Sequence, residues 1–223
     1  MKKEIIQKQN MKKQLPKIHS QHFILTNDRM IRTALKEKLE ESYGSLKNTK
    51  IIEELGLTHG EARIDIAVVN GVIHGYELKS DKDTLKRLPG QIEVYNTVLD
   101  RVTLVVGKNH LHEAIKIVPD WWGITIAKIV DSNNAVSFCK IREAEQNKNQ
   151  NSAAVAALLW REEALGILEK IGQDKGMRSK NRKAIYERLA EVLDKKTLKE
   201  IVREQLRSRL NWRSELQCMP SVD

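Results

Sequence analysis

Two acidic residues and one lysine stand on adjacent strand-like segments, and their types could do phosphate chemistry. Asp65 lies within residues 62–69, and Glu77-Leu78-Lys79 ends the segment 72–79. Asn70-Gly71 between them is the dipeptide that most favours a tight β-hairpin. Glu77-Leu78-Lys79 is the single Glu-x-Lys among the 223 residues. The hairpin is therefore predicted to gather two carboxylates and one ammonium group.

Such a cluster could bind a divalent metal ion and polarise a phosphodiester. Mg²⁺ or Mn²⁺ prefers oxygen ligands and usually takes one or two carboxylates, which Asp65 and Glu77 could supply together with the carbonyl of Leu78. The metal would lower the pKa of an attacking water, and Lys79 would stabilise charge on the phosphorus. We expect Asp65, Glu77 and Lys79 to be catalytic and Mg²⁺ or Mn²⁺ to be the cofactor. The alternative is a surface hairpin with ordinary charges.

The register of the hairpin decides whether these side chains share a face. A two-residue turn pairs Val69 with Val72, so that Asp65 and Glu77 point in opposite directions. One extra residue on either strand would set them opposite each other. Glycine inside a strand often marks a bulge, and Gly75 is the natural place for one. We predict an irregularity between Val69 and Glu77.

The elements that position the hairpin follow from hydrophobic periodicity, caps and breakers. Asn27 or Asp28 can cap a helix that runs to about Ser42. Further strands are predicted at 51–55, 101–106, 124–130 and 136–141, and further helices at 89–99, 110–117, 153–171, 179–193 and 197–210. The predicted organisation is a basic lead-in over 1–25, an α/β domain over 26–142, a polar linker over 143–152 and a helical C-terminal region over 153–223.

Charge and composition limit the classes of binding partner and the cellular compartment that we expect. The net charge is +9, with +7 in residues 1–50, −2 in 51–150 and +4 in 151–223. Basic ends around an acidic centre suit a polyanion such as nucleic acid, although a solubilising excess of lysine gives the same numbers. No apolar run is long enough to span a membrane, and the N-terminus lacks the apolar core of a secretory signal. Two distant cysteines indicate a reducing, cytoplasmic compartment.

A family resemblance rests on the same residues. Arg63-Ile64-Asp65, Glu77-Leu78-Lys79 and the later Gln91-x-x-x-Tyr95 resemble the PD-(D/E)XK nuclease superfamily, in the branch with a Gln-x-x-x-Tyr helix. Within it, the chain is similar to a little-characterised bacterial family and to small DNA-repair-associated members. The resemblance covers about residues 28–130. It departs from the name-giving pattern because Ile64 stands where proline is usual.

The resemblance implies a restriction-endonuclease-like α/β core with a mixed central sheet flanked by helices. It also implies metal-dependent hydrolysis of DNA, rather than RNA, in repair, restriction or defence against mobile elements. Asp65 and Glu77 match the metal ligands, Lys79 matches the catalytic lysine, and Glu54 is the candidate for an additional upstream acid. Gln91 and Tyr95 match the helix motif and would contact substrate; the alternative is a tyrosine packed on the sheet and a glutamine bonded nearby.

Basic residues around the hairpin and in the helical region could hold phosphates, with solvated surface charges as the alternative. The expected substrate-binding residues are Arg63, Lys86, Arg87, Arg178, Lys180, Arg182 and Lys183. The last four belong to residues 175–183, which carry five cations and no acid between two predicted helices. A second functional hypothesis is a nucleic-acid-binding or interaction module on an inactive nuclease fold, with a possible protein partner at the C-terminal helices.

Overall fold

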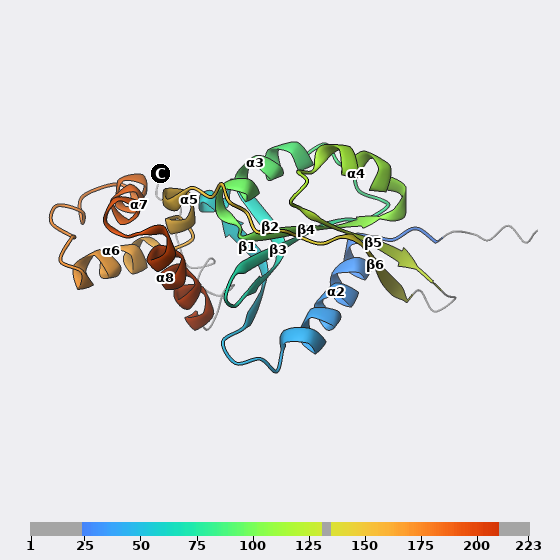
Figure 1. Ribbon diagram of the computed structural model, residues 1–223, viewed down its shortest axis with the longest axis horizontal. Helices are drawn as coiled ribbons and strands as arrows, with labels where there is room; N and C mark the ends of the chain where they lie inside the picture. Colours follow the sequence, from blue (N-terminus) through green and yellow to red (C-terminus); the bar gives the residue numbers. More distant parts are fainter. Residues whose placement is uncertain (1–23, 131–134, 210–223) are drawn as a thin grey trace, which may run out of the picture.

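A mixed six-stranded sheet forms the centre of the molecule, seen here in a computed structural model that describes residues 24–130 and 135–209 (Figure 1). The strands stand side by side in chain order. They are β1 (Lys50–Leu57), β2 (Ala62–Val69), β3 (Ile73–Lys79), β4 (Arg101–Gly107), β5 (Gly123–Ile129) and β6 (Val136–Arg142). Strands β3, β4 and β5 are parallel, and the remaining neighbours are antiparallel. The prediction of an α/β fold with a mixed sheet is confirmed; its finer form, a restriction-endonuclease-like core, is not.

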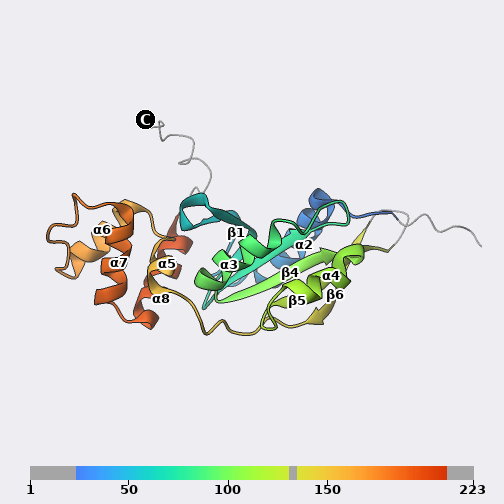
Figure 2. The ribbon, with the colours of Figure 1, turned by 90° about the horizontal axis from the view of Figure 1, so that it is seen from above.

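Helices cover both faces of the sheet. α2 (Asp28–Tyr43) lies on one face, and α3 (Leu88–Val98) and α4 (Leu111–Ile117) lie on the other (Figures 1 and 2). α2 begins as predicted, because the side chain of Asn27 accepts a hydrogen bond from the amide of Met30 at 3.0 Å. Its apolar stripe contributes Ile31, Leu35 and Leu39 to a core that also contains apolar residues of β2 and β3. The sheet therefore has two apolar faces, each closed by helix.

The C-terminal helices gather beyond the β1 side of the sheet (Figures 1 and 2). They are α5 (Ser152–Ala156), α6 (Arg161–Lys170), α7 (Arg182–Val192) and α8 (Lys195–Ser208). Their buried apolar residues belong to the same hydrophobic cluster as those of α3 and the sheet face beneath it. A helical C-terminal region is thus confirmed, and its core is continuous with that of the sheet.

The single helix predicted over 153–171 is wrong, because two helices with a break between them occupy this segment. α5 ends at Ala156 and α6 begins at Arg161. The amide of Trp160 donates to the side chain of Glu163 at 2.8 Å, which fixes the start of α6. The sequence from 153 to 160 is apolar at every position, so periodicity could not reveal the break.

Residues 143–152, predicted as a linker and named here the polar strap, run along the C-terminal end of α3. Asn147 and Gln150 are buried, and their amide groups donate to carbonyl oxygens of that helix end at 2.7–2.9 Å. These carbonyls have no partner within the helix itself. From α8, Lys195 and Lys199 each donate to Gln150 at 2.8 Å. The strap joins α3 to α8, and the division into separate domains stays a prediction.

The β2–β3 hairpin differs by one residue from the register of a two-residue turn, over the part of the strands that pairs, from Ile66↔Tyr76 to Val69↔Ile73. Val69 pairs with Ile73 and Ile66 pairs with Tyr76, so the turn contains three residues instead of two. The predicted irregularity between Val69 and Glu77 is therefore confirmed. Its placement at Gly75 is wrong, because Gly75 pairs regularly with its partner on β2 and the extra residue lies in the turn.

Gly75 is required by packing. A Cβ atom there would lie 2.7 Å from Leu99 Cδ1 and 3.0 Å from Ile64 Cγ1, and both side chains are fully buried. We expect Gly75→Ala to lower the free energy of unfolding by about 1–3 kcal/mol through overpacking, measured by urea denaturation. Gly71→Ala in the turn is the control, since nothing lies within 4 Å of its added Cβ. Equal stability of the two variants would contradict this packing.

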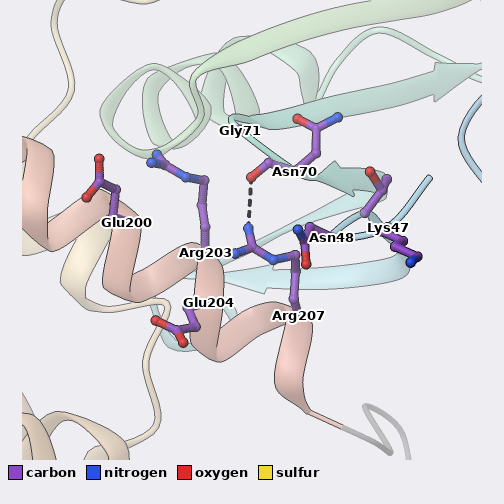
Figure 3. Close-up of a pocket in the computed structure, with 9 residues that line it drawn as sticks. Lys47, Asn48, Asn70, Gly71, Glu200, Arg203, Glu204 and Arg207 are labelled. Carbon is purple, nitrogen blue, oxygen red and sulfur yellow. Dashed lines mark hydrogen bonds between the residues drawn. The ribbon is translucent and has the colours of Figure 1, made fainter.

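The C-terminal half of α8 is tied to the hairpin turn. Arg207 Nη1 donates to the carbonyl oxygen of Asn70 at 2.9 Å (Figure 3). Lys50 Nζ donates to the carbonyl of Arg209 at the end of α8, where a cation is favourable. These contacts join segments far apart in the sequence.

Some predictions fall outside the described residues, including most of the basic lead-in and the segment from residue 210 onward. Among the residues that are described, no helix has the length and apolar character needed to cross a membrane. The cytoplasmic location stays a prediction.

Candidate functional site: a closed ionic cluster

An unusual backbone conformation in β1 prepares the site. Glu54 has φ 56°, in the left-handed region that residues other than glycine seldom adopt. The alternation of the strand breaks there, so that Ile52 and Leu55, three residues apart, both enter the core beneath α3. The carboxylate of Glu54 instead lies 2.9 Å from Arg32 Nη1 of α2. Local strain of this kind often accompanies a specialised polar site.

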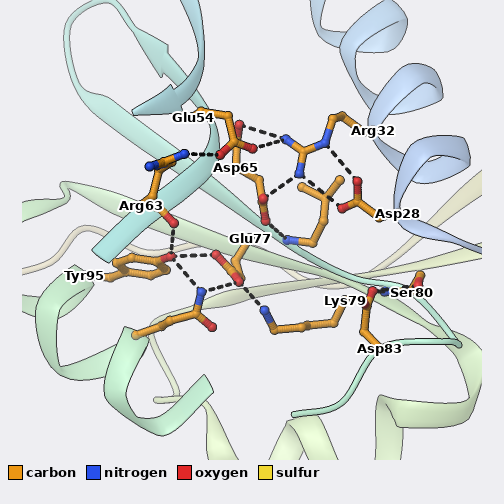
Figure 4. Close-up of polar contacts among 12 residues, drawn as sticks. Asp28, Arg32, Glu54, Arg63, Asp65, Glu77, Lys79, Ser80, Asp83 and Tyr95 are labelled. Carbon is orange, nitrogen blue, oxygen red and sulfur yellow. Dashed lines mark hydrogen bonds and ion pairs between the residues drawn. The ribbon is translucent and has the colours of Figure 1, made fainter. Parts of the chain in front are cut away.

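Arg32 gathers three carboxylates around one guanidinium (Figure 4). Its nitrogens lie 3.1 Å from Asp28, 2.9 Å from Glu54 and 2.6 Å from Asp65. Burial alone would lower the pKa of Arg32, but its bonds to Asp28 and Asp65 raise that pKa above its usual value. The guanidinium therefore remains charged and neutralises part of this acidic group.

Asp65 links that network to β3. Its Oδ2 accepts a hydrogen bond from the amide of Leu78 at 2.8 Å, and its Oδ1 accepts from Arg32. Burial raises the pKa of Asp65, while the Leu78 amide and Arg32 act in the opposite direction. Both oxygens of Asp65 thus have protein donors.

Glu77 is the centre of a second group, on the α3 side. It is 1% exposed, and its Oε1 accepts from Lys79 Nζ and from Gln91 Nε2, the latter at 2.7 Å. Its Oε2 lies 2.7 Å from the hydroxyl of Tyr95. Burial, and then the negative charge of Asp65, raise the pKa of Glu77, while Lys79 lowers it. Every polar atom of this carboxylate is engaged.

Gln91 and Tyr95 face Glu77 because they stand one turn apart on α3. Tyr95 is fully buried, and its hydroxyl also lies 2.6 Å from the carbonyl oxygen of Arg63. Gln91 Nε2 is 3.2 Å from that hydroxyl. Both side chains are therefore bonded to other groups of the protein. This arrangement corresponds to the alternative stated above, a tyrosine packed on the sheet and a glutamine bonded nearby.

The three predicted catalytic residues are neighbours, yet their carboxylates are bonded to two different helices. Asp65 is bonded to α2, whereas Glu77 is bonded to α3 on the other face of the sheet. Lys79 is 5% exposed and forms an ion pair with Glu77. Asp65 is paired with Arg32, which it shares with Asp28 and Glu54, and Glu77 is paired with Lys79.

A metal ion does not fit these donors as they are arranged. In the part of the chain that the structure describes, no three His, Cys, Asp or Glu side chains are grouped to hold a metal. Asp65, Glu77 and Glu54 already accept bonds from Arg32, Lys79 and α3. A Mg²⁺ ion keeps several ligands in near-octahedral geometry, which would require these ion pairs to open. Mg²⁺ or Mn²⁺ as cofactor stays a prediction, and the carboxylates that would bind it are already bonded to protein groups.

The predicted phosphate-binding residues lie elsewhere on the surface. Arg63 is exposed and 3.4 Å from Glu54, and Lys86 and Arg87 are exposed ahead of α3. Within residues 175–183, Arg178 pairs with Glu169 at 3.1 Å and Lys183 lies 3.9 Å from Glu187. Lys180 and Arg182 are exposed, with no side-chain bond to any described residue.

Sequence analysis missed Arg32, which holds the cluster closed. Its only local signal is Asp28 four residues earlier, a common pairing on a helix. Its contact with Asp65 spans 33 positions and depends on how α2 packs on the sheet.

The comparison with known families decides the affiliation of the chain. Residues 22–219 match the family described as bacteriophage P4 protein cII. The chain belongs to this family. Protein cII of Enterobacteria phage P4 is 28% identical over 148 residues, which are 66% of this chain and 55% of that relative. The chain therefore spans about half the length of the curated relative that it matches.

A solved structure with some likeness to this cII-family chain carries no conclusion. It is a protein of unknown function from Silicibacter pomeroyi, with a TM-score of 0.39 and 16% identity, covering 68% of this chain and 92% of that one. A likeness at this level does not establish a shared fold or function.

The nuclease interpretation is wrong. The prediction of a PD-(D/E)XK superfamily member, and with it that of a Mg²⁺-dependent nuclease that hydrolyses DNA, is overturned because the matching family and the curated relative are both protein cII. The closed cluster gives a physical account of how the pattern misled. An Asp and a Glu-x-Lys on paired strands can equally form internal ion pairs, as Asp65, Glu77 and Lys79 do here.

Proposed function

We propose that this cII-family chain is a nucleic-acid-binding module without hydrolytic activity, with DNA as its partner rather than RNA. One observation carries the proposal: residues 175–183, which run from the α6–α7 connection into the first turn of α7, expose five cations and contain no acid. Lys175, Lys180 and Arg182 of this segment form no side-chain hydrogen bond or ion pair with the described residues. Their charge is available to a phosphate backbone, which supplies most of the affinity in nonspecific binding.

The surrounding helices add to this attraction. Residues 152–209 hold 14 Lys and Arg against 9 Asp and Glu. The segment leads into the N-terminus of α7, where backbone N–H groups and the helix dipole favour an anion. The positive field and the helix start therefore act on the same partner.

Binding without hydrolysis agrees with the geometry of the ionic cluster. Glu77 and Lys79 are buried and paired with each other, so neither is presented to a phosphodiester. Asp65 is held by Arg32. These contacts support a structural role for the cluster and leave recognition to the basic surface. A protein partner at the C-terminal helices stays a prediction.

Removing two of the exposed lysines is expected to weaken DNA binding. Lys175→Ser together with Lys180→Ser should raise the Kd about tenfold and reduce the slope of log K against log salt by about 2, because two phosphate contacts are lost. Fluorescence anisotropy with a labelled duplex over a range of salt concentrations measures both quantities.

The matched control removes two lysines elsewhere. Lys116 of α4 and Lys128 of β5 are exposed, and both elements lie at the opposite end of the sheet from α6 and α7. Lys116→Ser with Lys128→Ser should leave the salt slope unchanged. Equal losses in both double variants would mean that net charge alone drives binding. Recovery of cleaved DNA after incubation with Mg²⁺ would refute a module without hydrolytic activity.

A further inference from the structure

A second cationic site lies between the helical region and the sheet. A pocket of about 390 Å³, named here the α8 pocket, is bounded by α8, the loop joining α2 to β1, and the β2–β3 turn (Figure 3). We propose that the α8 pocket binds successive phosphates of a nucleic-acid strand. The inference rests on the proposed function and gives it a contact site separate from residues 175–183.

Two arginines and a lysine supply the positive charge of the pocket. Arg203 and Arg207 stand four residues apart on α8, about 6 Å along the helix axis, and so share one face. Lys47 approaches from the loop before β1. Arg203 is half-buried and forms no hydrogen bond or ion pair with the described residues, and Arg207 donates to a neutral carbonyl. Guanidinium donors therefore remain for a ligand.

The acids that line the pocket do not neutralise these arginines. Glu200 and Glu204 each precede an arginine by three positions, yet neither forms an ion pair with Arg203 or Arg207 in the described structure. Figure 3 shows Arg207 extending to Asn70 of the turn, while Glu204 extends the other way. The two glutamates reduce the attraction for an anion without abolishing it.

Two walls of the α8 pocket are joined by hydrogen bonds. Arg207 is bonded to Asn70 of the turn, and Lys50 holds the carbonyl end of α8. α8 is therefore already held against the turn, which reduces the ordering that binding requires. Arginine also suits phosphate, because its planar fork can donate two parallel hydrogen bonds.

A strand of nucleic acid fits this arrangement better than an isolated anion does. Free phosphate or a mononucleotide offers the same chemistry at one point. A strand offers consecutive phosphates to two guanidiniums one helical turn apart, so both can bind at once. Affinity should consequently increase with oligonucleotide length.

The test is an anisotropy titration of the full chain with labelled oligonucleotides of increasing length, with inorganic phosphate and a mononucleotide as competitors. Arg203→Gln should weaken binding about three- to tenfold and lower the salt slope by about 1. Glu200→Gln with Glu204→Gln should strengthen binding by a similar factor. Arg29→Gln, an exposed arginine on α2, is the matched control and should leave both quantities unchanged.

The outcomes separate this inference from the proposed function. If the wild type binds DNA and neither the Arg203 variant nor the glutamate variants change affinity or slope, the pocket assignment is overturned and the proposed function stands. If the wild type binds no oligonucleotide, both are overturned. If free phosphate competes as strongly as an oligonucleotide at the same concentration of phosphate groups, the pocket is a small-anion site and its assignment to a strand is overturned. The glutamate variants, which remove no described contact, keep the test valid should Arg203→Gln fail to fold.

Discussion

Glu77→Ala should lower the free energy of unfolding by about 3–5 kcal/mol, because it leaves the buried ammonium of Lys79 without its counter-ion. The same change removes one acceptor of Gln91 Nε2 and one of the two acceptors near the Tyr95 hydroxyl. Urea denaturation followed by circular dichroism measures the loss. This is the largest effect that we expect from a single substitution in the molecule.

Replacing both charges distinguishes an internal ion pair from a pair held open for a ligand. Glu77→Leu combined with Lys79→Met should cost less than the sum of the two single changes, since neither charge remains buried alone. Glu77→Gln keeps a side chain of similar size and should fall between wild type and Glu77→Ala. Wild-type stability in Glu77→Ala would mean that the cluster is not closed as described.

Acid should destabilise the protein through His74 by as much as about 2–3 kcal/mol between pH 6.5 and 4. Burial, followed by the nearby charge of Arg101, lowers the pKa of His74 to about 4 from its ordinary 6.5. Over this interval His74 is protonated in the unfolded chain and stays neutral in the folded chain. The stabilisation is therefore complete above pH 6.5 and disappears as the pH falls through that range.

The surroundings of His74 explain why its neutral form is preferred. Its Nε2 lies 2.8 Å from Thr103 Oγ1 on β4, and its ring stacks on Tyr76 with centroids 4.4 Å apart. Unfolding free energies measured at pH 7 and pH 4.5 should converge in His74→Gln relative to wild type. His112→Gln, at an exposed position on α4, should retain the full wild-type difference. A His74 variant with unchanged acid sensitivity would rule out this histidine as the source.

Local signals in the sequence predicted the elements well. Asn27 marks the start of α2, Pro89 lies in the first turn of α3, and Asn70-Gly71 marks the turn between β2 and β3. Each of these depends on backbone preferences within a few residues. The limits that these signals mark therefore agree with the structure to within a few positions, whereas the helix predicted over 153–171 does not.

The bonding partners within the site could not be predicted, because they come from segments far apart in the sequence. Whether Asp65 is open to a metal or closed by Arg32 is decided by the packing of α2 against the sheet. The α8 pocket joins Arg207 to Asn70 across 137 positions. The residue types were identified correctly as a cluster, but the chemistry inferred from them was not.

The polar strap limits where segments of this chain could be recombined with those of other proteins. Asn147 and Gln150 satisfy the carbonyl end of α3, and Lys195 and Lys199 grip the strap from α8. A chimera that grafted α5–α8 without residues 143–151 onto a foreign scaffold would leave Lys195 and Lys199 without their acceptors on Gln150. Recombination that preserves these contacts would have to carry both the strap and residues 96–100 with the helices.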